Sequence, residues 1–481
     1  MQICAAKRGL SRVSTNTRDL PRPLPFDVSF GEVTAKGNWN LPLVDPYQSQ
    51  HIFGVDYHTS FAMEPEGDDL ECKSVESAPA DQDIPDEGLL AWLQVLGAFL
   101  NFFNTWGVIN AFGTFQAYYQ TRFPDVSAST ISWIGSIDAF ILMGFGIISG
   151  PLLDLGYFRA LQLTGSVLVL LGIFMTSIAS EFWQVMLAQG LCFGFGCGCL
   201  YTPSLAIIST YFSKKRSIAI GIVTSGSGFG SVVYSIVFYR LQPRLGEAQA
   251  FRIIGYIALG TLLVSVALLR PRITPTIRRS FFAAAAFKEP AFAWFTAAVF
   301  FGYMGLYVPI DYVSSFAGNK LQASKDMTFY MVPILNAGSI VGRIVPNYLA
   351  DRMGPINVLI PFTFACGILA FGWLGVRSVA GLIVFSVLYG FCSGTYVSLP
   401  PAAVARLTAD LHHVGSRMGT CFLFAALGIL IGSPVAGQLV TTDPPVYWKA
   451  EVFCGVIVFT ALTCTVCARI ANVGARIKAT T

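Results

Sequence analysis

The sequence predicts an all-α polytopic membrane protein with twelve transmembrane helices in two six-helix halves. Of its 481 residues 54% are hydrophobic and only 12% are charged, and the mean hydropathy is +0.60, whereas soluble domains carry about 25% charged residues. Long apolar stretches follow one another from residue 91 with few polar interruptions. The two halves of that region also share a repeated pattern of an acid followed by a glycine.

Residues 1–85 differ from the rest of the chain. They are rich in Pro, Ser, Asp and Glu, they hold 13 of the 27 acids, and they show no sustained periodicity. Such a composition predicts a disordered cytoplasmic N-terminal tail. No signal peptide is evident, because the first apolar run of adequate length begins near residue 91, and Met63 stays open as an alternative start.

The apolar stretches have the length that crosses a bilayer as a helix. Continuous apolarity over this length favours helices over the alternating strands of a barrel. The predicted spans are 91–115, 131–151, 160–180, 183–211, 217–239, 251–269, 291–316, 327–350, 356–376, 379–403, 416–440 and 449–470.

The longest inner loop divides the helices six and six. We expect an N-terminal bundle at 86–270, a cytoplasmic linker loop at 271–290, a C-terminal bundle at 291–470 and a cytoplasmic tail at 471–481. Lys and Arg in the predicted inner loops outnumber those in the outer loops, which predicts both termini in the cytosol. An integral protein of this kind is expected in the plasma membrane.

An internal repeat supports that division. "SGPLLDLGYFR" follows the second predicted helix, and "PNYLADRMGPIN" follows the eighth, which is second in its own half. Parallel repeats around a central path are an architecture of secondary transporters.

Three stretches carry a family resemblance: "PDEGLLAWLQVLGAF", "STYFSKKRSIAIGIVTSGSGFG" and "NAGSIVGRIVPNYLADRMGPIN". Together they resemble the major facilitator superfamily, and within it the fungal monocarboxylate-porter-like (monocarboxylate transporter) group, over about residues 85–470. The residues that match the superfamily's inter-helix loop motif are Asp154, Asp351, Arg352 and Gly354.

The resemblance implies the major facilitator fold and alternating access, with helices 1, 4, 7 and 10 lining the cavity. Animal relatives move lactate-like anions with a proton, using a lysine in helix 1 and an aspartate and an arginine four residues apart in helix 8. Arg343 matches that arginine, but Ser339 stands at the aspartate position and Asn110 at the lysine position. The missing charges weaken the implication of lactate specificity and of an animal-type proton relay.

A polar stripe crosses the eighth predicted helix. Asn336, Ser339, Arg343 and Asn347 share one helical face, and a charge within a span needs a partner, a cavity or a ligand. One interpretation is an arginine that contacts an anionic substrate, flanked by hydrogen-bonding groups. The other is a structural arginine bonded to helix ends near an inner gate.

Tyrosines recur on two other predicted helices. Tyr303 and Tyr307 precede Asp311 on one face of the seventh, and Tyr389 and Tyr396 share a face of the tenth. Buried tyrosines offer aromatic area and a hydroxyl that needs a partner. These four are substrate-binding candidates for a ring-bearing or amphipathic solute, with helix packing as the alternative.

Two acids are proton-coupling candidates. Asp138 lies within the second predicted helix, where burial favours the neutral form of a carboxyl, and a structural acid bonded to a neighbouring helix is the alternative. Asp311 lies near the outer boundary, where a solvated rim acid is the favoured interpretation. All four histidines fall outside the predicted helices and are excluded as intramembrane proton carriers.

The predicted function is secondary transport of a small organic solute, with protons as a candidate coupling ion. The absent lysine and aspartate, together with the tyrosine faces, favour export of an anionic or amphipathic fungal secondary metabolite over proton-coupled uptake of a monocarboxylate. A non-transporting sensor on a transporter fold is the alternative of another class. No enzyme, metal, cofactor or nucleic-acid partner is predicted, and the absence of GK[ST] disfavours ATP.

Overall fold

The structure is a computed structural model that describes residues 88–272, 282–408, 413–442 and 445–473. All of these residues belong to one compact unit, Ser77–Thr481. The predicted tail 1–85 lies outside the described residues, as do residues 273–281 of the linker 271–290 and residues 474–481 of the tail 471–481.

The first six spans comprise more than six elements, because three of them are interrupted. The elements are α1 (Leu89–Asn104), α2 (Trp106–Asn110), α3 (Phe112–Arg122), α4 (Ala128–Gly144), α5 (Gly146–Asp154), α6 (Phe158–Thr176), α7 (Phe182–Val185), the π-helix η1 (Met186–Phe193), α8 (Gly194–Tyr211), α9 (Arg216–Leu245) and α10 (Glu247–Leu268).

The second six spans are mostly single helices. The elements are the 3₁₀ turn η2 (Ala284–Lys288), α11 (Pro290–Asn319), α12 (Lys325–Met353), α13 (Pro355–Gly372), the 3₁₀ turn η3 (Trp373–Gly375), α14 (Val379–Arg406), α15 (Val414–Leu439) and α16 (Trp448–Val473). Between α15 and α16, β1 (Thr441–Thr442) pairs antiparallel with β2 (Pro445–Val446).

In the described residues, twelve helical segments are long and apolar enough to cross a membrane. This confirms the prediction of a twelve-helix all-α protein. The first segment runs from Leu89 to Arg122, seven residues beyond the predicted end at 115. Its last turns are polar, and helix there is stabilised by tertiary contacts of Tyr119 and Arg122 rather than by apolarity.

The first span is broken twice. Thr105 separates α1 from α2, and Ala111 separates α2 from α3. The Thr105 hydroxyl donates to the carbonyl of Asn101, 2.8 Å away. Broken helices with irregular backbone are tolerated inside a membrane protein where they are buried or line a cavity.

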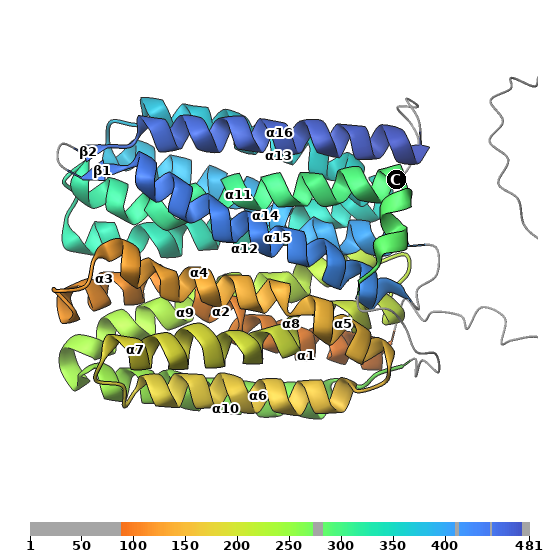
Figure 1. Ribbon diagram of the computed structural model, residues 1–481, viewed down its shortest axis with the longest axis horizontal. Helices are drawn as coiled ribbons and strands as arrows, with labels where there is room; N and C mark the ends of the chain where they lie inside the picture. Colours follow the sequence, from red (N-terminus) through yellow and green to blue (C-terminus); the bar gives the residue numbers. More distant parts are fainter. Residues whose placement is uncertain (1–87, 273–281, 409–412, 443–444, 474–481) are drawn as a thin grey trace, which may run out of the picture. The chain divides into compact units, whose positions relative to one another are not determined.

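The two halves meet along two seams. Figure 1 shows α1–α10 and α11–α16 running alongside each other, with α9 against α12 in one seam and α4 and α5 against α15 in the other. Glycines allow the close approach: a Cβ on Gly221 of α9 would overlap the Arg343 carbonyl, and one on Gly150 of α5 would overlap the Gly415 carbonyl. The helices therefore pack backbone to backbone at these points.

Candidate functional site

An open cavity of about 850 Å³, a volume that includes space open to solvent, lies between the two halves. Its walls come from α2, α3 and α4 of the first half and from α11, α12 and α15 of the second. The polar residues that line it are Asn110, Gln116, Ser132, Ser136, Tyr307, Asp311, Tyr312, Ser315 and Ser433.

Three of the predicted site residues line this cavity: Asn110 of α2, and Tyr307 and Asp311 of α11. Ser433 of α15 donates to the Asp311 carboxylate at 2.5 Å. Among the described residues, the Tyr307 hydroxyl makes no hydrogen bond, so it is available to a solute in the cavity.

Arg343 lies outside the cavity lining and is only 4% exposed. Its Nη1 donates to the Thr224 carbonyl at 2.7 Å and to the Ser227 hydroxyl, both on α9. Its Nε has no hydrogen-bond partner among the described residues, and no described carboxylate forms an ion pair with it. A buried cation without a counter-charge is costly.

A band of aromatic rings, Tyr201, Trp106 and Tyr307, connects the two halves. The ring centroids of Trp106 and Tyr307 lie 5.9 Å apart, and those of Trp106 and Tyr201 6.1 Å apart. Trp106 and Tyr201 belong to the first half, and Tyr307, which lines the cavity, belongs to the second.

The other predicted tyrosines have their hydroxyls bonded within the second half. Tyr389 donates to the Leu306 carbonyl at 2.9 Å, and Tyr396 to the Ala298 carbonyl at 2.7 Å. Tyr303 donates to Val397 at the long distance of 3.5 Å. In this conformation the geometry corresponds to the packing alternative for Tyr389 and Tyr396.

The polar neighbours of Arg343 on α12 also bond locally. Asn336 donates to the Val332 carbonyl at 3.1 Å, and Ser339 to the Asn336 carbonyl at 2.9 Å. Both are buried and neither lines the cavity. The stripe is therefore one face of α12 turned to protein, with only Val332 of this helix reaching the cavity wall.

Asp138 faces away from the cavity. It is 2% exposed and lies against Gly194 of α8. Its Oδ1 has no hydrogen-bond partner among the described residues. Of the two predicted proton-coupling acids, only Asp311 lines the cavity.

The loop-motif acids close the opposite end of the bundle, here called the motif end. Asp351 accepts from the Ser217 and Ile218 amides, at 2.7 and 2.9 Å, in the first turn of α9. Asp154 accepts from the Ser416 amide at 3.3 Å, in the first turn of α15. Each acid thus binds the positive end of a helix in the other half.

The remaining motif residues shape the end of α12. Gly354 has φ 91°, and its amide donates to the Ala350 carbonyl at 2.8 Å, which ends the helix. Arg352 is exposed and donates to the Tyr348 hydroxyl. The cavity opens at the other end, here called the cavity end, beside Gln116 and Ser315.

Several lining residues were not predicted. Ser132 and Ser136 share a face of α4 at i and i+4, and Ser433 faces them from α15. The i, i+4 spacing of Ser132 and Ser136 is visible in the sequence and could have identified this polar face of α4.

Comparison with known proteins gives matches over most of the chain. A sequence profile described as Major Facilitator Superfamily matches residues 95–381 and 348–476. The chain is 42% identical to the MFS-type transporter dbaD of Emericella nidulans, over 75% of this chain and 82% of that protein. It is 38% identical to the aspyridones efflux protein apdF of the same organism, over 75% and 74%.

Solved structures share the fold. The human organic anion transporter MFSD10 (TETRAN) superposes with a TM-score of 0.60 at 17% identity, over 78% of this chain and 98% of that chain. At this identity the likeness is one of fold.

Proposed function

This chain belongs to the Major Facilitator Superfamily, and we propose that it exports an anionic or amphipathic fungal secondary metabolite by alternating access. It is an integral membrane protein. Two similar relatives are a transporter and an efflux protein from a fungus, which supports export. The monocarboxylate-porter-like grouping stays part of the proposal.

The observation that carries the proposal is Arg343. A guanidinium has five N–H donors, and here Nη1 alone is bonded to protein, across the seam to α9. No described carboxylate neutralises the charge. Because Arg343 lies outside the cavity lining, an acidic group of a solute would contact the Tyr307 hydroxyl in this conformation and would meet the cation once the seam to α9 opens.

The aromatic band supports the amphipathic part of the proposed substrate class. Tyr307 lines the cavity, and its ring lies 5.9 Å from that of Trp106, which in turn lies 6.1 Å from that of Tyr201. Ring stacking on such surfaces adds about 0.5–1.5 kcal/mol beyond area burial. A small aliphatic anion such as lactate cannot use that area, whereas a ring-bearing acid can.

Alternating access is supported by the asymmetry of the two ends. The motif end is closed by Asp351 and Asp154 on helix starts of the opposite half. The cavity end is open to solvent. We propose that the motif end faces the cytosol of a fungal plasma membrane, with both termini inside, as the distribution of Lys and Arg favours.

Export of an anion needs no separate energy source in principle. Moving one negative charge out of a cell at −100 mV releases about 2.3 kcal/mol. Proton coupling would therefore modulate the transport cycle and is not required to drive export. We propose Asp311, in the cavity wall, as the group through which pH acts.

The test is untargeted metabolite profiling of cells and medium, with and without the protein, in a host that makes acidic ring-bearing metabolites. We expect at least one such compound to fall in the medium and rise in the cells when the protein is removed. If deletion leaves every acidic metabolite unchanged and slows uptake of an added monocarboxylate, uptake replaces export. If the level of no metabolite changes in cells or medium, the result favours the alternative of a non-transporting sensor.

A further inference from the structure

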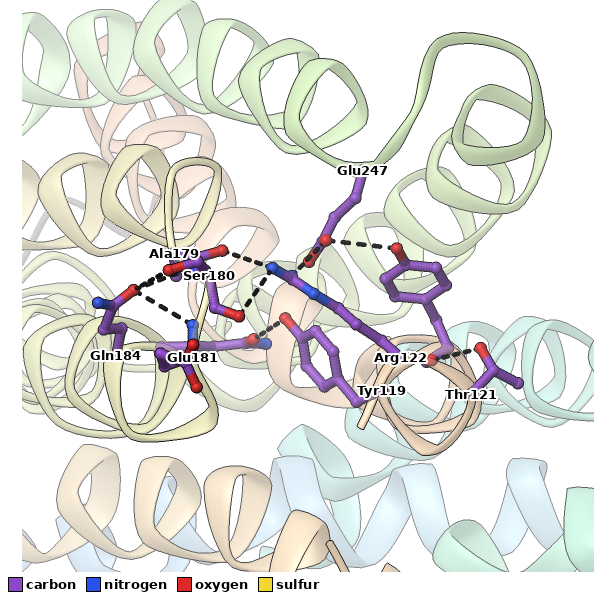
Figure 2. A network of polar contacts seen from close by, with 10 residues as sticks. Tyr119, Thr121, Arg122, Ala179, Ser180, Glu181, Gln184 and Glu247 are labelled. Atoms are coloured by element: carbon purple, nitrogen blue, oxygen red, sulfur yellow. Dashed lines mark hydrogen bonds and ion pairs between the residues drawn. The ribbon is translucent and has the colours of Figure 1, made fainter. Parts of the chain in front are cut away.

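A network of polar contacts ties the outer end of the first span to the rest of its half (Figure 2). Arg122 of α3 forms an ion pair with Glu247, the first residue of α10. Tyr118 donates to the same carboxylate at 3.3 Å. Arg122 also donates to the Ala179 carbonyl at 2.6 Å, in the loop between α6 and α7.

The second half has an ion pair at the equivalent place. Lys320, directly after α11, lies 3.7 Å from Glu451 in the first turn of α16. α11 is the first span of its half and α16 the sixth, as the α1–α3 span and α10 are in theirs. We call Arg122–Glu247 the N-half clamp and Lys320–Glu451 the C-half clamp.

The two clamps share more than their charges. Each cation lies at a helix C-terminus and each acid at a helix N-terminus, where the helix dipoles favour them. Arg122 lies over the ring of Phe123 at 4.9 Å, and Lys320 over the ring of Phe316 at 4.5 Å. Both acids are shielded, with side-chain exposures of 12% for Glu247 and 0% for Glu451.

Each clamp holds one helix of the cavity wall, α3 in the first half and α11 in the second. Gln116, less than two turns before Arg122, lines the cavity from α3, and Ser315, five residues before Lys320, lines it from α11. α3 is a separate segment, broken from α2 at Ala111. Beyond that break, the direction of α3 is set by tertiary contacts, and the ion pair of Arg122 is the one at its end.

We propose that the N-half and C-half clamps set the width of the cavity mouth, by fixing the outer ends of α3 and α11 to the sixth helix of their own half. Arg122, Glu247, Lys320 and Glu451 are positioning residues that do not touch the solute. The inference rests on the proposed function in one respect, since it takes this cavity as the solute path.

The clamps differ in how much else supports them. α11 packs closely along α16, whereas α3 contacts α10 through Arg122, Tyr118 and the ring of Phe115 against Phe251 at 5.3 Å. Loss of the N-half clamp therefore releases its wall further than loss of the C-half clamp.

The experiment measures the mouth directly and needs no substrate. Gln116→Cys reports on α3 and Ser315→Cys on α11. Purified protein in detergent is labelled with a polar maleimide, and the rate without either reporter is subtracted as background from the native cysteines. Glu247→Gln, which removes the charge and keeps the shape, is combined with each reporter in turn, and so is Lys320→Gln.

We expect Glu247→Gln to change the labelling rate of Gln116→Cys several-fold, and to change that of Ser315→Cys less. Lys320→Gln should act mainly on Ser315→Cys, with a smaller effect. The exchange of charges in Arg122→Glu with Glu247→Arg should bring the rate back towards that of the parent. Arg244 is an exposed cation in the last turn of α9, three residues before Glu247. Arg244→Gln should leave the labelling rates of both reporter cysteines unchanged.

Folding is monitored by size-exclusion profile and melting temperature. If Glu247→Gln folds and both reporters react at the parental rate, the clamps do not set the mouth and the proposal is wrong. If Arg244→Gln changes the rates as much as Glu247→Gln, surface charge is the cause and the proposal is equally wrong. Because no solute is used, either result leaves the export hypothesis to its own test.

Discussion

Arg343 of α12 reaches across the seam between the two halves and donates its Nη1 hydrogen to the Thr224 carbonyl of α9, 2.7 Å away. The cation is therefore bound by the half opposite to its own. When the seam opens during alternating access this bond must break, and the charge then needs another partner. Under the proposed function an anionic solute supplies that partner, which would link loading and opening at one side chain.

The first prediction concerns that side chain. Arg343→Lys keeps the charge but loses the planar fork of donors, so we expect impaired export. Arg343→Gln removes the charge, and a charged hydrogen bond is worth about 1.5–3 kcal/mol, so we expect export of an anion to fall by about 10- to 100-fold. The measurement is flux, with surface abundance beside it.

Both variants should still insert, because removing a charge from a span makes insertion easier. Normal export by a fully abundant Arg343→Gln would show that the arginine does not bind substrate. Degradation of that variant would instead assign Arg343 to the seam alone.

The second prediction separates the two tyrosine environments. Tyr307 lines the cavity without a hydrogen bond from its hydroxyl among the described residues, whereas Tyr396 donates to the Ala298 carbonyl at 2.7 Å. We expect Tyr307→Phe to raise the KM for export and to leave the melting temperature unchanged. Tyr396→Phe should leave KM unchanged and lower stability by about 1 kcal/mol.

The contrast is the control, since the two substitutions remove the same atom. Equal effects of both on KM would mean that the seventh and tenth spans contact the solute alike. Equal effects of both on stability would mean that the Tyr307 hydroxyl has a structural partner.

The third prediction is a pH dependence with a defined sign. Asp311 lies one helical turn, about 6 Å, from Tyr307 on the same cavity wall. An ionised carboxylate there repels an anionic solute, and acidification favours the neutral form. The affinity for the anion in the cavity should therefore increase as pH falls. Asp311→Asn should abolish this pH dependence and keep the high affinity at every pH.

Asp138→Asn is the matched variant, because Asp138 faces Gly194 and does not line the cavity. It should keep the pH profile of the parent and its melting temperature. A profile that is lost in Asp138→Asn and kept in Asp311→Asn would reverse the assignment of the two acids.

The sequence allowed the fold to be predicted because length and apolarity are local properties. A run of about twenty apolar residues crosses a bilayer as a helix whatever it packs against. The first span was predicted too short because α3 is polar, and what keeps it helical is distant in sequence: Tyr119 donates to Gln189, 70 residues away, at 2.7 Å.

The candidate site was predictable only where one helix face carries it. Tyr307 and Asp311 share a face of α11, and the cavity lies on that face. Ser433 and Gln116 came into the site by tertiary packing, which no single helix reveals. The same holds for Arg122 and Glu247, which are 125 residues apart, and for the side of the seam to which Arg343 turns.

The last prediction concerns the closed motif end, where the two loop-motif acids are not equal. Asp351 holds two amides of α9 at 2.7 and 2.9 Å, whereas the amide that Asp154 holds in α15 is 3.3 Å away. All three bonds oppose opening of this end, because each joins an acid of one half to a helix start of the other. Asparagine keeps one acceptor oxygen but loses the charge that the helix dipole stabilises, a loss of about 0.3–1 kcal/mol for the dipole alone.

We therefore expect Asp351→Asn to shift the protein towards opening at the motif end, and Asp154→Asn to shift it less. A cysteine at the exposed Lys214, beside the start of α9, would react faster with a polar maleimide in the first variant than in the second. A larger effect of Asp154→Asn would mean that the α5–α15 seam, rather than the α9–α12 seam, controls opening at this end.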